Sequence, residues 1–219
     1  MGSDEQFAFA FVPDSGDARL FIKLSGYRAD LVEAQLGLEW ALDSKAPESP
    51  TAGAFAIFIG YATVAYCRTI LHSNVREPLT NYVAIPDGLD DMHQLIKSFR
   101  NTTVAHSQSD LTSTYVVADF SDRYPDGAGV IAFTESQTLP WTVVAEFQRL
   151  VEHLICGVDE LIVPVRGRLT ALATEERGAE RWRSATDLVV EDLTSKEFTA
   201  RTRRRAYPTK RTAYWDPVD

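Results

Sequence analysis

The chain has 219 residues, of which 45% are hydrophobic and 24% charged, a composition that supports a sizeable folded core and excludes global disorder. The formal net charge of -9 argues against a general nucleic-acid coat protein, although it is compatible with a local basic site. Only two cysteines are present, which argues against a disulfide framework and against a cysteine-based zinc site.

The N-terminal sequence and the longest apolar run indicate where in the cell the protein is expected. The N-terminal sequence MGSDEQ is acidic, which does not fit a secretory signal. The longest apolar run, from Ala54 to Cys67, is shorter than the roughly 20 residues that span a bilayer. We therefore expect no membrane partner and a reducing, cytoplasmic location.

The first segment alternates between apolar and other residues. Residues 7–12 and 18–24 show this period-two pattern on either side of the turn sequence PDSGD. Such a pattern predicts a β-hairpin. Residues 1–26 are accordingly expected to form an N-terminal hairpin ahead of the main domain.

Three helices are expected next, from apolar residues at helical spacing over residues 28–42, 54–71 and 89–106. The second is apolar nearly all round, which predicts a central place in a bundle. The core stripe of the third helix is expected to contain Met92, Leu95, Ile96 and Phe99.

A second hairpin is expected near residues 113–135, where two alternating runs enclose a turn-rich loop. A long helix follows Pro140, and Pro164 should end or kink it. A weaker helix is expected over residues 168–177. The predicted fold class is α+β and mostly helical, with a bundle of four or five helices over residues 27–174 and small antiparallel β-hairpins.

Residues 175–219 read as a charged C-terminal extension in which residues 187–193 suit an edge strand. Six of the 22 Lys and Arg residues lie between Arg201 and Arg211, interleaved with Tyr207. Basic residues mixed with aromatic ones suit contact with single-stranded RNA. A solvated tail that balances acidic neighbours is an equally good interpretation.

The end of the third helix, FRNTTVAHS, gathers three polar groups of chemical interest. Arg100 offers the planar fork of donors that binds phosphate, and His106 is a general acid or base near neutral pH. On a straight helix the two lie about 120° apart and do not touch. Two copies packed about a two-fold axis would bring both to one cleft. The alternative is the solvated end of a helix with one buried histidine.

Residues 99–106 resemble the signature of the HEPN superfamily, an arginine followed by a polar residue, a short spacer and a histidine. Here Asn101 is the polar residue, and four residues separate it from His106. The helical context of residues 28–173 agrees with the resemblance. It implies a HEPN-like bundle of four or five helices and a homodimer with the motif at its interface.

The resemblance also implies an activity. Many members are metal-independent endoribonucleases without a cofactor, and others bind proteins or nucleotides without catalysis. His106 would act as general base or acid on the ribose 2′-OH or the leaving 5′-oxygen, and Arg100 would stabilise charge on the phosphate. Asn101 would position the phosphate or the histidine, and the products would carry 2′,3′-cyclic phosphate ends. RNA is then the expected partner, and a toxin or defence role would add a cognate inhibitor protein.

Other residues are weaker candidates. His93 and Lys97 lie on the Arg100 side of the helix and would extend an anion-binding groove, although a solvated helix face is the simpler interpretation. Asp90 and His93 have the spacing of a metal-binding pair, but no matching pair occurs on another helix, so no metal is expected. An unrelated helical protein in which residues 99–106 match by coincidence is the third hypothesis. The weaker RNA-binding candidates are His93, Lys97, Arg201, Arg203, Arg204 and Arg205.

Overall fold

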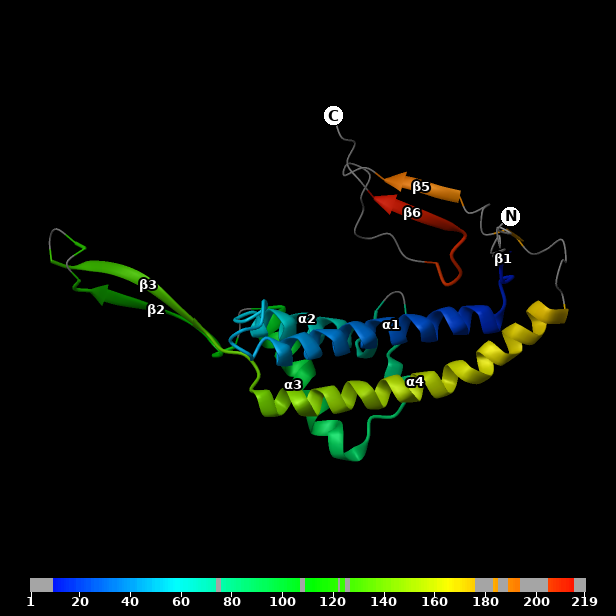
Figure 1. The fold of residues 1–219 in the computed structure, drawn as a ribbon, viewed down its shortest axis with the longest axis horizontal. Helices are drawn as coiled ribbons and strands as arrows, with labels where there is room; N and C mark the ends of the chain where they lie inside the picture. The colour runs from blue at the N-terminus through cyan, green and yellow to red at the C-terminus, as the bar shows by residue number, and fades with distance from the viewer. Residues whose placement is uncertain are drawn as a thin grey trace. The chain divides into compact units, whose positions relative to one another are not determined.

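The computed structural model is mostly helical with small sheets, which confirms the expected α+β class. Its helices are α1 (Gly16–Asp43), α2 (Phe55–Ile70), α3 (Asp90–Phe99) and α4 (Trp141–Glu175), as Figure 1 shows. Shorter turns are η1 (Leu79–Asn81), η2 (Asp87–Leu89) and η3 (Arg100–Val104). The structure describes residues 10–73, 76–106, 109–121, 123–124, 127–175, 183–184, 189–193 and 205–214.

The chain divides into two compact units. The first takes its residues from Met1–Arg28, His72–Glu77 and Val158–Asp219, and the second from Ala29–Leu71 and Pro78–Gly157. Helices α1 and α4 therefore contribute to both units. The sequence at residues 99–106 lies in the second unit.

The N-terminal hairpin predicted for residues 1–26 is wrong in its second strand, because residues 18–24 belong to α1. The side chain of Ser15 accepts a hydrogen bond from the N–H of Ala18 at 3.1 Å and caps the first turn. Strand β1 is only Ala10–Phe11, and it pairs antiparallel with β4 (Arg183–Ser184) rather than with a neighbouring strand. Residues 7–9 lie outside the described part of the chain. The fully buried stripe of α1 has the 3- and 4-residue spacing of a helix and consists of Leu24, Tyr27, Leu31, Ala34, Leu38 and Ala41.

The core of the second unit joins α2, α3 and the first half of α4. Tyr66 of α2 packs edge-on against Phe147 of α4, with ring centroids 5.2 Å apart. Helix α3 buries Met92, His93, Ile96 and Phe99. The expected core residue Leu95 is instead 41% exposed, because the buried face of α3 is turned toward His93.

The predicted second hairpin is present. Strands β2 (Thr112–Asp119) and β3 (Gly129–Ser136) pair antiparallel from Thr112 with Ser136 to Asp119 with Gly129. Figure 1 draws the two strands in green. Both faces of this hairpin expose apolar side chains, with Val116 78% exposed on one face and Phe133 53% exposed on the other.

Helix α4 does not end at Pro164 but runs through it to Glu175, so residues 168–175 of the separate helix expected over residues 168–177 are part of α4. Proline has no N–H, so Pro164 cannot donate the helical hydrogen bond to the carbonyl of Glu160. Both residues are exposed, so this carbonyl lies on the side of the helix that is open to water. Strand β5 (Val189–Leu193) falls within the expected edge strand and pairs in parallel with β6 (Lys210–Tyr214). Within the described part of the chain, no helix combines the length and apolar character that crossing a bilayer requires.

Candidate functional site

The candidate site lies on η3, where the α-helical path of α3 widens into a π-helical turn. The N–H of Ala105 donates to the carbonyl of Arg100, five residues earlier, at 2.9 Å. Three β-branched residues in a row, Thr102 to Val104, disfavour the tighter α-helical turn. The Thr102 hydroxyl also donates back to the carbonyl of Ser98 at 2.9 Å, a bond that perturbs helix ends. Turns of this kind occur often at functional sites.

The structure brings two of the three predicted site residues into contact. The guanidinium of Arg100, which is half-buried, donates through Nη1 to Oδ1 of exposed Asn101 at 3.0 Å. His106 lies two residues beyond the turn and is exposed, which contradicts the alternative of a buried histidine. Among the described residues, no hydrogen bond joins His106 to Arg100 or Asn101.

The turn carries positive charge that the neighbouring residues leave largely uncompensated. In the described part of the chain, Arg100 forms no ion pair with a carboxylate, whereas Arg68 of α2 pairs with Asp30 at 3.0 Å. Arg100 and Lys97 lie close enough to Cys67 to act on its thiol. Burial raises the pKa of that thiol to about 11, and the two cations oppose the rise. An anion that approaches η3 would meet these same cations.

His93, predicted as a weak RNA contact, is instead part of the core. It is 5% exposed, and its Nδ1 lies 2.7 Å from the hydroxyl of Tyr66. Burial lowers the pKa of His93, the charge of Lys97 lowers it further, and Asp90 opposes the change. His93 shares the buried face of α3 with Ile96, so both the groove and the solvated-face interpretation are wrong for this residue.

The remaining weak RNA-binding candidates are Lys97 and four arginines of the C-terminal segment. Lys97 is half-buried and reaches Oε1 of Gln94 at 3.4 Å. Arg205 is exposed. Arg201, Arg203 and Arg204 lie outside the described residues. Among the residues that the structure describes, no three His, Cys, Asp or Glu side chains gather in a position to hold a metal ion.

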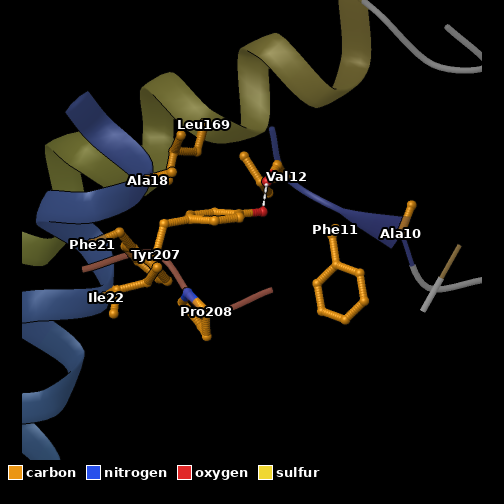
Figure 2. Close-up of a pocket in the computed structure, with 9 residues that line it drawn as sticks. All are labelled: Ala10, Phe11, Val12, Ala18, Phe21, Ile22, Leu169, Tyr207 and Pro208. Carbon is orange, nitrogen blue, oxygen red and sulfur yellow. Dashed lines mark hydrogen bonds between the residues drawn. The ribbon is translucent and has the colours of Figure 1, made fainter. Parts of the chain in front are cut away.

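Sequence reasoning missed a pocket in the first unit, which Figure 2 shows. It has a volume of about 400 Å³ and an apolar lining drawn from β1, α1, α4 and the segment around Tyr207. The Tyr207 hydroxyl donates to the carbonyl of Val12. Because Val12 and Tyr207 are 195 positions apart in the chain, no local pattern predicts the pocket. Tyr207 is half-buried there and packs against its own chain. The pocket is lined by Ala10, Phe11, Val12, Ala18, Phe21, Ile22, Leu169, Tyr207 and Pro208.

Comparison with known proteins finds no relative of this chain. No family model, no curated protein and no solved structure matches the chain.

Proposed function

We propose that the protein is a metal-independent endoribonuclease of the HEPN type that acts as a homodimer through Arg100, Asn101 and His106. One observation supports the proposal above the others. The π-helical turn presents a guanidinium without a carboxylate partner among the described residues, held by an amide, and a solvent-exposed imidazole follows two residues later.

The chemistry follows from these groups. Arg100 uses the donors that Asn101 leaves free to bind the non-bridging oxygens of a phosphodiester and to stabilise its developing charge. His106 takes the proton of the ribose 2′-OH, and the 2′-oxygen attacks phosphorus. The bond from phosphorus to the 5′-oxygen breaks, and that oxygen leaves with a proton from an imidazolium or from water. The products are a 2′,3′-cyclic phosphate and a 5′-hydroxyl.

The homodimer is part of the proposal because Arg100 and His106 are not bonded within one chain. A two-fold axis close to η3 would place Arg100 of one copy beside His106 of the second. Each dimer would then hold two composite sites.

The test is cleavage of single-stranded RNA in the presence of a chelator. We expect fragments with 2′,3′-cyclic ends from the wild type, and a loss of about 100-fold or more in Arg100→Ala and in His106→Ala. Arg149→Ala and His153→Ala change exposed residues of the same types in the same unit and serve as matched controls. Cleavage that persists in both Arg100→Ala and His106→Ala would overturn the proposed site.

Mixing the two inactive variants tests the composite site. A mixed dimer of Arg100→Ala and His106→Ala retains one site with both wild-type residues if the two come from different chains. We therefore expect partial recovery of cleavage on mixing. For the toxin or defence role, expression of the wild type should arrest growth of a host cell, and expression of His106→Ala should not.

A second candidate is a protein-binding module without catalysis, and exposed apolar residues on two adjacent helices favour it. Trp40 of α1 contacts Phe58 of α2 with ring centroids 5.6 Å apart, so the two helices share this surface. Absence of cleavage by folded wild-type protein, together with growth that is independent of His106, would favour this candidate. The exposed residues are Val32, Leu36, Trp40, Ile57, Tyr61 and Val64.

A further inference from the structure

The β2–β3 hairpin, called the arm below, has no partner on either face among the described residues. In the register of the arm, Tyr115 lies opposite Phe133 on one face, and Val116 lies opposite Ala132 on the other. Side chains from both faces are exposed, so neither face is covered. The large exposed apolar residues of the arm and its end are Tyr115, Val116, Val117, Phe120, Val130 and Phe133.

The free edge of β2 is open for pairing. The N–H of Gln137 donates to the carbonyl of Leu111 at 2.6 Å, which marks Leu111 and Gln137 as a hydrogen-bonded pair. Since such pairs alternate along an antiparallel ladder, the backbone groups of Thr114, Val116 and Ala118 are directed away from β3. Among the described strands, β2 pairs only with β3.

The sequence of the arm does not protect this edge. Natural edge strands are commonly guarded by lysine, by proline or by inward charges. From Thr112 to Ala118 the strand contains none of these. Asp119, at its end, is engaged in an ion pair with Arg123. An isolated hairpin of two strands is at best marginally stable in water, and further strands stabilise it.

We propose that the partner of the arm is a second copy of this chain, and that the two β2 edges pair antiparallel to form a four-stranded sheet. A two-fold axis perpendicular to a strand pairs that strand with itself in antiparallel orientation. With Tyr115 on the axis, Val116 faces Thr114 of the second copy, and Asp119 lies outside the paired region. Pairing of two β3 edges would instead place the carboxylate of Glu135 within the paired region. The β2 edge, which has no charge from Thr112 to Ala118, is therefore favoured.

The small size of the β2–β2 contact limits the expected affinity of the two copies for each other. β2 has eight residues, fewer than the roughly 20–30 residues a side of a standard stable interface. The association should therefore be concentration-dependent rather than permanent. This association does not depend on RNA cleavage. Because Thr112 follows His106 closely in the chain, paired arms would nevertheless tether two copies of η3.

The test measures the mass of the full chain by sedimentation over a wide concentration range. The wild type should shift from one chain toward two as its concentration rises. Val116→Pro removes an outward N–H without removing a bond to β3 and should abolish the shift. Ala132→Pro, directly opposite, makes the same change on the free edge of β3 and should dimerise as the wild type does.

Val116→Lys provides a second variant, because Val116 is 78% exposed and the lysine can be solvated in the monomer. It should also prevent dimerisation, since two like charges would meet near the two-fold axis. A wild type that stays monomeric, variants of Val116 that still dimerise, or equal loss in Ala132→Pro would overturn the inference. Cleavage assays on the same variants separate the two proposals: a monomeric Val116→Pro that still cleaves RNA contradicts the two-chain site and leaves the arm contact standing.

Discussion

The hydroxyl of Tyr66 lies 2.7 Å from Nδ1 of His93, and both side chains are buried in the core of the second unit. Burial raises the pKa of Tyr66, so the phenol keeps its proton. The tautomer of the neutral imidazole decides which of the two atoms donates in this bond. This bond joins α2 to α3 two turns before the candidate site.

Removal of the Tyr66 hydroxyl should destabilise the protein. Tyr66→Phe leaves the shape of the ring in place but leaves Nδ1 of His93 buried without a partner. We expect the free energy of unfolding to fall by about 1–3 kcal/mol, measured by urea denaturation. The double variant Tyr66→Phe/His93→Leu should recover part of this loss, because no polar atom of the pair then remains buried. Equal stability of Tyr66→Phe and the wild type would contradict the assigned bond.

The lowered pKa of His93 should make stability depend on pH. The unfolded chain binds a proton at His93 near pH 6.5, the ordinary value, whereas the folded chain binds it only at lower pH. Stability from this group is therefore complete above pH 6.5 and is lost as the pH falls from 6.5 toward the folded pKa. Urea titrations between pH 7.5 and 5.5 should show this loss in the wild type. The loss should be smaller in His93→Gln, whereas a change at exposed His153 should leave it intact.

The burial of His93 also shows what the sequence could not predict. The helical spacing of apolar residues in α3 predicts its existence and its buried Met92, Ile96 and Phe99. It also predicts Leu95 rather than His93 as the fourth buried residue, which is wrong, because both flank the same stripe and only Leu95 is apolar. The phenol of Tyr66, 27 positions away, makes the imidazole acceptable in the core, and no local pattern contains that information.

The second strand of the predicted N-terminal hairpin is wrong for a different reason. Residues 18–24 fit a period of two over so short a window, and a helix can imitate that pattern. The hydrogen bond from the N–H of Ala18 to the Ser15 side chain caps the helix, and the buried stripe from Leu24 onward has helical spacing. Both favour the helix α1 over a strand. At the candidate site, the motif residues were visible in the sequence, whereas the π-helical turn was not.

Gly157 is a test of packing in the second unit. A Cβ at this position would lie 2.5 Å from Cγ1 of Val83, a stiff β-branched side chain that is 8% exposed. Gly157→Ala should therefore lower the thermal midpoint, at a cost of about 1–3 kcal/mol, despite the better helix propensity of alanine. Gly167→Ala, in the same helix with no atom within 4 Å of the new Cβ, should instead be neutral or stabilising. Val83→Ala combined with Gly157→Ala should restore most of the loss.

The two cysteines should differ in reactivity. Cys67 is buried, and its pKa is raised to about 11, so little thiolate is present at neutral pH. Cys156 is exposed. A water-soluble thiol reagent should modify one thiol per folded chain quickly and the second only after denaturation. Cys156→Ser should remove the fast phase, and a fast phase that survives in this variant would show that Cys67 is accessible.

Asn101 is expected to act by positioning Arg100 rather than by contacting the reacting atoms. Asn101→Ala removes the acceptor that holds Nη1 at 3.0 Å, so we expect cleavage to fall by about 10-fold, less than in Arg100→Ala. Asn101→Asp has nearly the same shape but places a carboxylate on the guanidinium and neutralises it. This variant should cleave more slowly than Asn101→Ala and should bind RNA with a weaker dependence on salt, because one phosphate contact is lost. The readout is therefore double: the cleavage rate at saturating RNA, and the slope of affinity against salt concentration. If Asn101→Asp retained the salt dependence of the wild type, Arg100 would not be the residue that binds phosphate.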